Sequence, residues 1–154
     1  MNETEIQMQS RYGAPDKKYV VTSLTQLLEG AVTRVYNFNG WTIKAAFLNG
    51  KVVRIVYSKV AKPNVTLSIQ DDEAKAVLDA EAGNGKWEEI ARLGQKPLKS
   101  LPWVISDKAW VHTNGNVSCL YMSRMMIQID SPAVDVYLDP VSYTHLTLPT
   151  NREV

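Results

Sequence analysis

The chain has 154 residues, 45% of them hydrophobic, which is enough for one hydrophobic core but short for two domains. Its 17 basic and 16 acidic residues leave a net charge of +1, so no overall field attracts nucleic acid or an anionic membrane. No apolar run reaches the length of a membrane span. The composition predicts one globular domain with no nucleic-acid partner and no membrane span.

A short helix is predicted first in chain order, over residues 4–12. Ile6, Met8 and Tyr12 stand at rough helical spacing in this segment. Gly13 follows it directly and Pro15 lies just beyond, an arrangement typical of a helix end.

Residues 31–58, AVTRVYNFNGWTIKAAFLNGKVVRIVYS, form the segment around which the chain is organised. Asn-Gly at 39–40 and at 49–50 separates three runs rich in β-branched and aromatic residues, which is the strongest local signal for hairpins. We predict a three-stranded antiparallel meander with a type I′ turn at Asn39-Gly40. Its shared apolar face is expected to carry Tyr36, Phe38, Trp41, Ile43, Val53, Ile55 and Tyr57.

The second turn of this meander decides the register. A two-residue turn at Asn49-Gly50 would set Arg54 opposite Ala45 on the apolar face. A three-residue loop over 48–50, with Gly50 in the left-handed bulge position, instead pairs Ala45 with Val53. We predict the three-residue loop because it keeps that face apolar.

A second helix is predicted over residues 69–82, with acidic residues at 71–73 in its first turn and Gly83 at its end. Its apolar side is expected to cover the sheet. Residues 84–102 are expected to be irregular, because Gly94, Pro97 and Pro102 prevent a long helix.

The remaining elements complete an α+β fold. Residues 110–113 and 117–122 are predicted to form a second hairpin about Asn114-Gly115-Asn116, and residues 125–129 a further strand. Ser131 and Pro132 then favour the start of a helix. We therefore predict an antiparallel β-meander covered by helices, with a second, C-terminal hairpin.

The end of the chain has an unusual origin. Residues 141–150, VSYTHLTLPT, resemble the translation of a transposase sequencing adapter, a contaminant of open reading frames from short-read metagenomic assemblies. The last four residues fit the index and fixed segment that follow such an adapter. We expect residues 1–139 to form a single native domain with a truncated C-terminus, and residues 140–154 to be an adapter-derived artefact.

His112 and Cys119 are the one pair that fits a thiol nucleophile with a base. If Gly115-Asn116 are the central turn residues, His112 faces Cys119; if Asn114-Gly115 are, it faces Val117. The sequence leaves both open. Simpler roles are a buried small side chain at Cys119 and a polar strand residue at His112.

No metal site or cofactor is predicted. Zinc and iron sites need clustered Cys and His, and the native part of the chain has one of each. The acidic residues at 71–73 point in different directions around a helix, so complementing the helix dipole is their simpler role.

A set of aromatic residues is the more promising candidate for binding. It consists of Trp87, Trp103, Trp110 and Tyr121. Large aromatic side chains often form recognition surfaces, and equally often fill a core.

Several short motifs resemble a group of uncharacterised bacterial proteins that are usually exported. They are the segments 11–15 (RYGAP), 40–41 (GW), 49–51 (NGK) and 57–59 (YSK). The order of helix, G-x-P and strands is more distantly similar to BamE-like outer-membrane-assembly lipoproteins and β-lactamase-inhibitor-like modules, although this chain lacks a lipobox cysteine and paired cysteines. The resemblance implies a periplasmic or secreted protein, whose export signal would have stood upstream of Met1.

The sequence thus predicts a non-catalytic binding or interaction module of an exported protein, a monomer or weak dimer with an unknown protein or small-ligand partner. One alternative is a small hydrolase using His112 with Cys119 or a carboxylate. Another is a cytoplasmic nucleic-acid-binding or mobile-element protein, which would need a basic face from Lys86, Arg92, Lys96 and Lys99.

Overall fold

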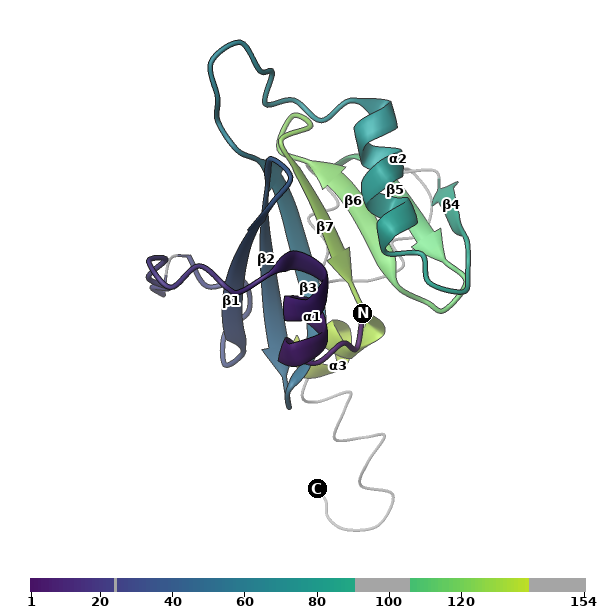
Figure 1. Ribbon diagram of the computed structural model, residues 1–154. Helices are drawn as coiled ribbons and strands as arrows, with labels where there is room; N and C mark the ends of the chain where they lie inside the picture. The colour runs from purple at the N-terminus through teal and green to yellow at the C-terminus, as the bar shows by residue number, and fades with distance from the viewer. Residues whose placement is uncertain (24, 91–105, 139–154) are drawn as a thin grey trace.

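The computed structural model describes residues 1–23, 25–90 and 106–138 (Figure 1). Within these ranges, seven strands form one antiparallel sheet in the order β1-β2-β3-β7-β6-β5-β4. The predicted adapter-derived segment, 140–154, lies outside the described residues.

Two meanders make up this sheet. The first contains β1 (Val32–Phe38), β2 (Trp41–Leu48) and β3 (Lys51–Lys59). The second contains β4 (Trp87–Ile90), β5 (Ser106–His112), β6 (Val117–Tyr121) and β7 (Met126–Asp130). Because β3 pairs with β7, the predicted meander and the predicted second hairpin belong to one continuous sheet. An antiparallel sheet with separate helices confirms the predicted α+β class.

Three helices accompany the sheet: α1 (Glu5–Tyr12), α2 (Asp71–Ala80) and α3 (Pro132–Leu138). In Figure 1, α1 lies in front of the first meander and α2 in front of the second. Val134 of α3 packs in a separate cluster with Ala46 and Val53. In the described part of the chain, no helix is long and apolar enough to cross a membrane.

The ends of α1 follow from the sequence. Thr4 Oγ1 accepts a hydrogen bond from the backbone N–H of Gln7 at 3.3 Å, and Gln7 Oε1 accepts one from the N–H of Thr4 at 2.8 Å. This reciprocal capping box satisfies two backbone donors that the helix leaves free. Gly13 ends the helix with φ 84°, as its position predicted.

The main core lies between α1, α2 and one face of the sheet. Its buried residues are Met8, Tyr12, Tyr36, Ile43, Ala45, Phe47, Val52, Ile55, Tyr57, Ile69, Ala74, Val77, Leu78, Leu120, Ile127 and Ile129. Most of the apolar face predicted for the first meander is therefore correct. Phe38 lies at its edge, where its ring meets the Tyr12 ring at 5.3 Å.

The predicted loop between β2 and β3 is wrong. Asn49 and Gly50 both have positive φ, 52° and 77°, which is the two-residue type I′ turn. A β-bulge follows instead: Phe47 pairs with Val52 and Ala46 pairs with Arg54, so Val53 is the extra residue. The bulge keeps Arg54 off the main core face. The three-residue loop was predicted for that same reason.

Arg54 also marks the junction between the two meanders. Its guanidinium forms two hydrogen bonds with Asp130, at 2.9 and 3.0 Å, across the β3–β7 pair. A third bond, 2.6 Å long, runs from Arg54 to the carbonyl oxygen of Leu27. The Asp130 side chain is fully buried, so this ion pair is an internal part of the sheet.

Residues 84–102 were predicted to be irregular, and their described part corrects this. Residues 87–90 form β4, which pairs with residues 109–112 of β5. This strand has little pattern of its own in the sequence, because only four residues pair and two of them are glutamates.

Candidate functional site

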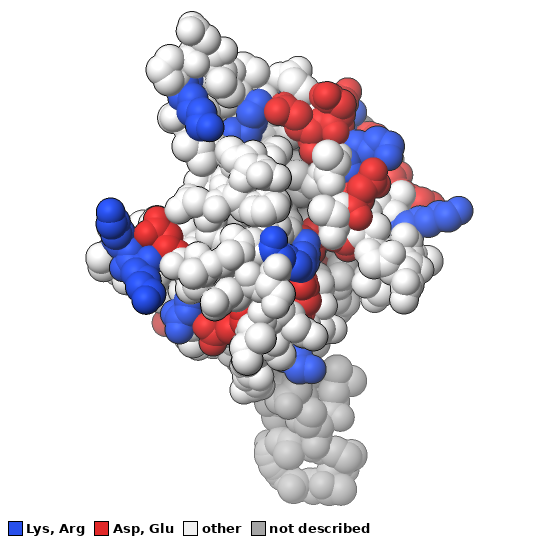
Figure 2. Space-filling view, in the orientation of Figure 1, with Lys and Arg blue, Asp and Glu red and all other residues white. Residues whose placement is uncertain are grey.

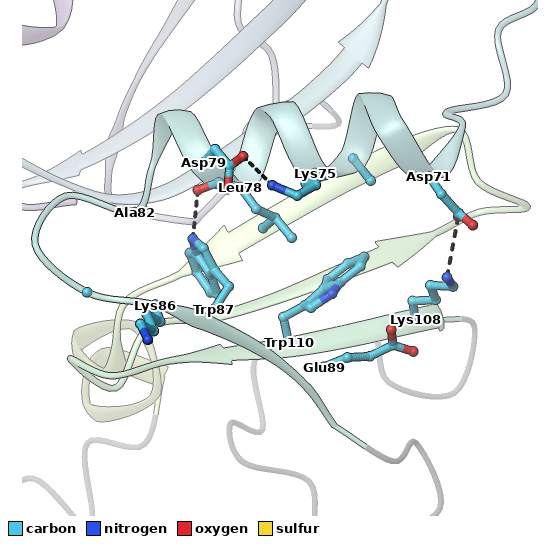
Figure 3. A pocket seen from close by; sticks show the side chains of 12 residues that line it. Asp71, Lys75, Leu78, Asp79, Ala82, Lys86, Trp87, Glu89, Lys108 and Trp110 are labelled. Carbon is cyan, nitrogen blue, oxygen red and sulfur yellow. Dashed lines mark hydrogen bonds and ion pairs between the residues drawn. The ribbon is translucent and has the colours of Figure 1, made fainter.

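A groove of about 470 Å³ runs between α2 and the β4–β5 edge of the sheet (Figure 3). Leu78 of α2, Trp87 of β4 and Trp110 of β5 supply its apolar lining. Both tryptophans are half-buried and pack against the main core. We call this cavity, defined by these three residues and the charged residues around them, the α2 groove.

The strand pairing explains why the two tryptophans meet. Trp87 lies opposite His112 and Glu89 lies opposite Trp110 in the β4–β5 ladder. Because alternate residues of a strand share a face, all four side chains lie on the α2 side of the sheet. The sequence separates Trp87 from Trp110, and this pairing brings them together.

Trp87 is fixed in position and Trp110 is less constrained. The indole N–H of Trp87 donates to the carbonyl oxygen of Leu78 at 2.8 Å. Its ring also meets the His112 ring edge-on, with 4.9 Å between centroids. The indole N–H of Trp110 has no hydrogen-bond partner among the described residues, so a donor remains for a ligand.

His112 is held beside the groove by hydrogen bonds between both ring nitrogens and the backbone. Its Nδ1 accepts a hydrogen bond from the backbone N–H of Asn114 at 3.1 Å, so the proton of the neutral ring is on Nε2. Nε2 then donates to the carbonyl oxygen of Ala82, 2.6 Å away, just beyond α2. Gly85 is required beside it, because a Cβ there would collide with the His112 ring. His112 thus ties the end of α2 to the β5–β6 turn.

His112 and Cys119 do not face each other. The turn between β5 and β6 has three residues, since the N–H of His112 donates to the carbonyl oxygen of Asn116, and Gly115 has φ 93°. Cys119 therefore pairs with Ala109, on the opposite side of the sheet from His112, and both predicted pairings are wrong. Burial raises the pKa of the Cys119 thiol to about 12, so it stays protonated at neutral pH.

Charged residues surround the groove, and most are paired. Asp71, at the start of α2, forms ion pairs with Arg124 at 2.6 Å and with Lys108 at 3.3 Å. Hydrogen bonds from Arg124 and Lys108 lower the pKa of Asp71 below its usual value. Lys75 and Asp79 pair along α2 at 2.8 Å. Figure 2 shows charges of both signs gathered over this part of the molecule.

A buried polar cluster lies at the other end of α2 and was missed from the sequence. The Glu81 side chain is 1% exposed and accepts hydrogen bonds from Arg11 at 2.6 Å, from Tyr12 at 3.0 Å and from Tyr57. Burial, together with the Glu81 charge, raises the pKa of both tyrosines above the ordinary value. Because the carboxylate is enclosed, this cluster joins α1, α2 and β3 rather than meeting a ligand.

The signal for this cluster was present in the short motifs. Arg11 and Tyr12 belong to the RYGAP segment, and Tyr57 begins the YSK segment. Lys59 of the same segment pairs with Glu73 of α2 at 2.9 Å. The motifs therefore have structural roles, and the missing partner, Glu81, stood unmarked at the end of a predicted helix.

The other predicted site residues do not join the groove. Tyr121 packs on the opposite face of the sheet, beside the cluster that contains Cys119, so its grouping with the tryptophans was wrong. Trp103, Arg92, Lys96 and Lys99 lie outside the described residues. Over the described ranges, no three metal-ligating side chains gather in one place.

Comparison with known proteins adds no relative. No family model matches the chain, and no curated protein or solved structure is significantly similar to it. The function of this chain is therefore inferred from the geometry of the α2 groove.

Proposed function

We propose that this protein is a non-catalytic binding module and that the α2 groove receives its partner. The observation that carries the proposal is the pair of half-buried tryptophans, Trp87 and Trp110, side by side beneath α2. Large aromatic surfaces of this kind dominate binding energy where a ligand completes their burial. A concave, mainly apolar site with a few polar groups is also the usual form of a ligand pocket.

A small hydrolase has less support than a binding module. Both ring nitrogens of His112 are engaged with backbone atoms, and Cys119 lies across the sheet from it. A histidine that acts as a general base needs a free ring nitrogen within reach of the reacting proton. Glu89 supplies a carboxylate to the groove, but no serine, threonine, cysteine or histidine stands with it among the described residues of the lining.

A nucleic-acid-binding protein is also less supported. Such a protein needs a surface with an excess of positive charge. The charged residues that line the groove are Asp71, Lys75, Asp79, Lys86, Glu89 and Lys108, which balance in sign. A protein segment or a small ligand suits this lining better.

The motif resemblance further supports an exported module, periplasmic or secreted, acting as a monomer or weak dimer. Resequencing the locus with adapters removed would test the location. Codons for a signal peptide upstream of Met1 would support export. A start at Met1 among cytoplasmic or phage-like genes would instead favour a cytoplasmic protein.

The binding proposal can be tested with a display library of random short peptides selected on the wild-type protein. We expect enriched peptides to bind Trp110→Ala at least about tenfold more weakly, as for a hot-spot residue. Trp110→Phe, which keeps an aromatic ring, should lose less and guards against misfolding of the alanine variant. Trp41→Phe is the matched control. Trp41 is also a partly buried tryptophan, but it belongs to β2 in the first meander. The proposal fails if no peptide is enriched or if Trp110→Ala binds them unchanged.

A further inference from the structure

The charges around the α2 groove are not equally satisfied. Asp71 has two cationic partners, and Lys75 and Asp79 neutralise each other along α2. Lys86 and Glu89 also line the groove, but neither has an ion pair within the described residues. Two unpaired charges of opposite sign therefore remain for a ligand.

These two charges lie at separate points along the groove. Lys86 directly precedes Trp87, close to the end of α2, whereas Glu89 pairs in register with Trp110. Lys86 stands just before β4 and Glu89 lies within it, three residues further on, or about 10 Å at the spacing of extended chain. Figure 3 shows Lys86 beside Trp87 at one end and Glu89 beside Lys108 at the other, with the indoles between.

Between the two charges, the groove offers apolar surface and one hydrogen-bond donor. Leu78 and the two indoles provide the apolar contact. The indole N–H of Trp110 is unpartnered in the described part of the chain and can donate to a carbonyl oxygen. A peptide backbone supplies such an oxygen at every residue.

We propose, building on the binding function above, that the partner is a short extended peptide segment with a basic residue at one end, an acidic residue at the other and apolar residues between them. The basic residue lies against Glu89 and the acidic residue against Lys86. A segment charged with one sign alone would meet repulsion at one end of the groove, which gives selectivity through charge arrangement.

The test uses three capped tetrapeptides, acetyl-Lys-Leu-Leu-Glu-amide, acetyl-Lys-Leu-Leu-Lys-amide and acetyl-Glu-Leu-Leu-Glu-amide, titrated at low salt. Binding is followed by the NMR resonance of the Trp110 indole N–H. Wild type should prefer the mixed peptide by roughly two- to fivefold, the size expected of an exposed ion pair. Glu89→Lys should shift the preference to the acidic peptide, and Lys86→Glu to the basic one. The double variant K86E/E89K should prefer the mixed peptide again.

Glu88→Lys is the matched control. Glu88 is equally exposed on β4 but pairs with Val111 and lies on the other face of the sheet, so its reversal should leave the ranking unchanged. The same ranking in every protein, or no shift of the Trp110 resonance with any tetrapeptide, overturns the charge inference. If peptides from the library still bind in a way that depends on Trp110, the proposed binding function stands without the charge inference. If no such peptides are found either, both proposals fail.

Discussion

Each half of the molecule holds an aromatic pair between a helix and the sheet, and the two pairs differ in how completely they are enclosed. In the first half, Tyr12 and Tyr57 are buried and both hydroxyls bond to Glu81. In the second, Trp87 and Trp110 remain half-buried between α2 and the strands. One helix–sheet layer is thus closed over its aromatic side chains in one half and leaves them partly exposed in the other.

Strand length accounts for part of this difference. The strands of the first meander have seven, eight and nine residues, whereas β4 has four. A short edge strand offers α2 a narrow surface, so the described residues leave space beside the helix on that side. The α2 groove lies in this space.

Removing the carboxylate of Glu81 should have the largest effect on stability, because it removes the acceptor at the centre of the buried polar cluster. Glu81→Ala removes the carboxylate that accepts from Arg11 and from two buried hydroxyls, although Arg11 keeps Glu3 and the two hydroxyls keep their bond to each other. We expect a loss of about 3 kcal/mol in the free energy of unfolding. Urea denaturation measures it. Glu81→Gln keeps the shape and one acceptor, so it should cost less, and equal losses in the two variants would contradict the role of the charge.

Alkaline pH should weaken the second half through Cys119. Burial raises the pKa of this thiol to about 12 in the folded state, against about 8.5 in an unfolded chain. The folded state holds the proton more tightly, so its contribution is complete below pH 8.5 and is lost as the pH rises toward 12.

We therefore expect Cys119→Ala to flatten the fall in stability, so that wild type loses about 2 kcal/mol more than the variant between pH 8 and pH 10.5. Urea denaturation at several pH values gives both curves. Parallel curves would contradict the expectation.

A matched pair of substitutions compares the two halves directly. Tyr57→Phe removes one hydroxyl bonded to a buried carboxylate, and we expect it to cost about 1.5 kcal/mol. Trp110→Phe removes an indole N–H that has no partner among the described residues, and should cost less than about 1 kcal/mol of stability while weakening peptide binding. The reverse order of stabilities would show that the tryptophan, not the tyrosine, is structural.

The smallest effect is expected at the exposed pair on α2. Lys75 and Asp79 are mainly solvent-exposed and lie four residues apart. Lys75→Ala should change the free energy of unfolding by no more than about 0.5 kcal/mol, as is usual for such pairs. Thermal unfolding at low and high salt checks it, and a larger change would mean that the stability of α2 depends on this exposed pair.

Local signals in the sequence located both Asn-Gly turns of the first meander and the starts of α1 and α3, but the type of the second turn was predicted wrongly. Asn39-Gly40 and Asn49-Gly50 both adopt the backbone that two-residue hairpins require, and Ser131 accepts a hydrogen bond from Ala133 at the start of α3. In each case the chemistry lies within a few residues. The position of Val53 was not predictable in this way, because its packing with Val134 across the sheet, far away in the chain, accompanies the bulge.

The candidate site was only half predictable for the same reason. The size of Trp87 and Trp110 marked them from composition alone, but their meeting depends on β4, a strand with little pattern of its own. The unpaired state of Lys86 and Glu89 depends on which other charges find partners. Both the meeting of the tryptophans and the unpaired charges depend on contacts that form when the whole sheet is assembled.

The Arg54–Asp130 pair has a consequence for how the chain folds. Each meander consists of neighbouring strands joined in sequence, apart from the longer β4–β5 connection, so much of each can form through local contacts. The β3–β7 junction instead unites residues 76 positions apart. Closing so long a loop costs chain entropy before any contact offsets it, and slow folding follows from such distant pairing. We expect the rate of folding to be set where the two meanders meet.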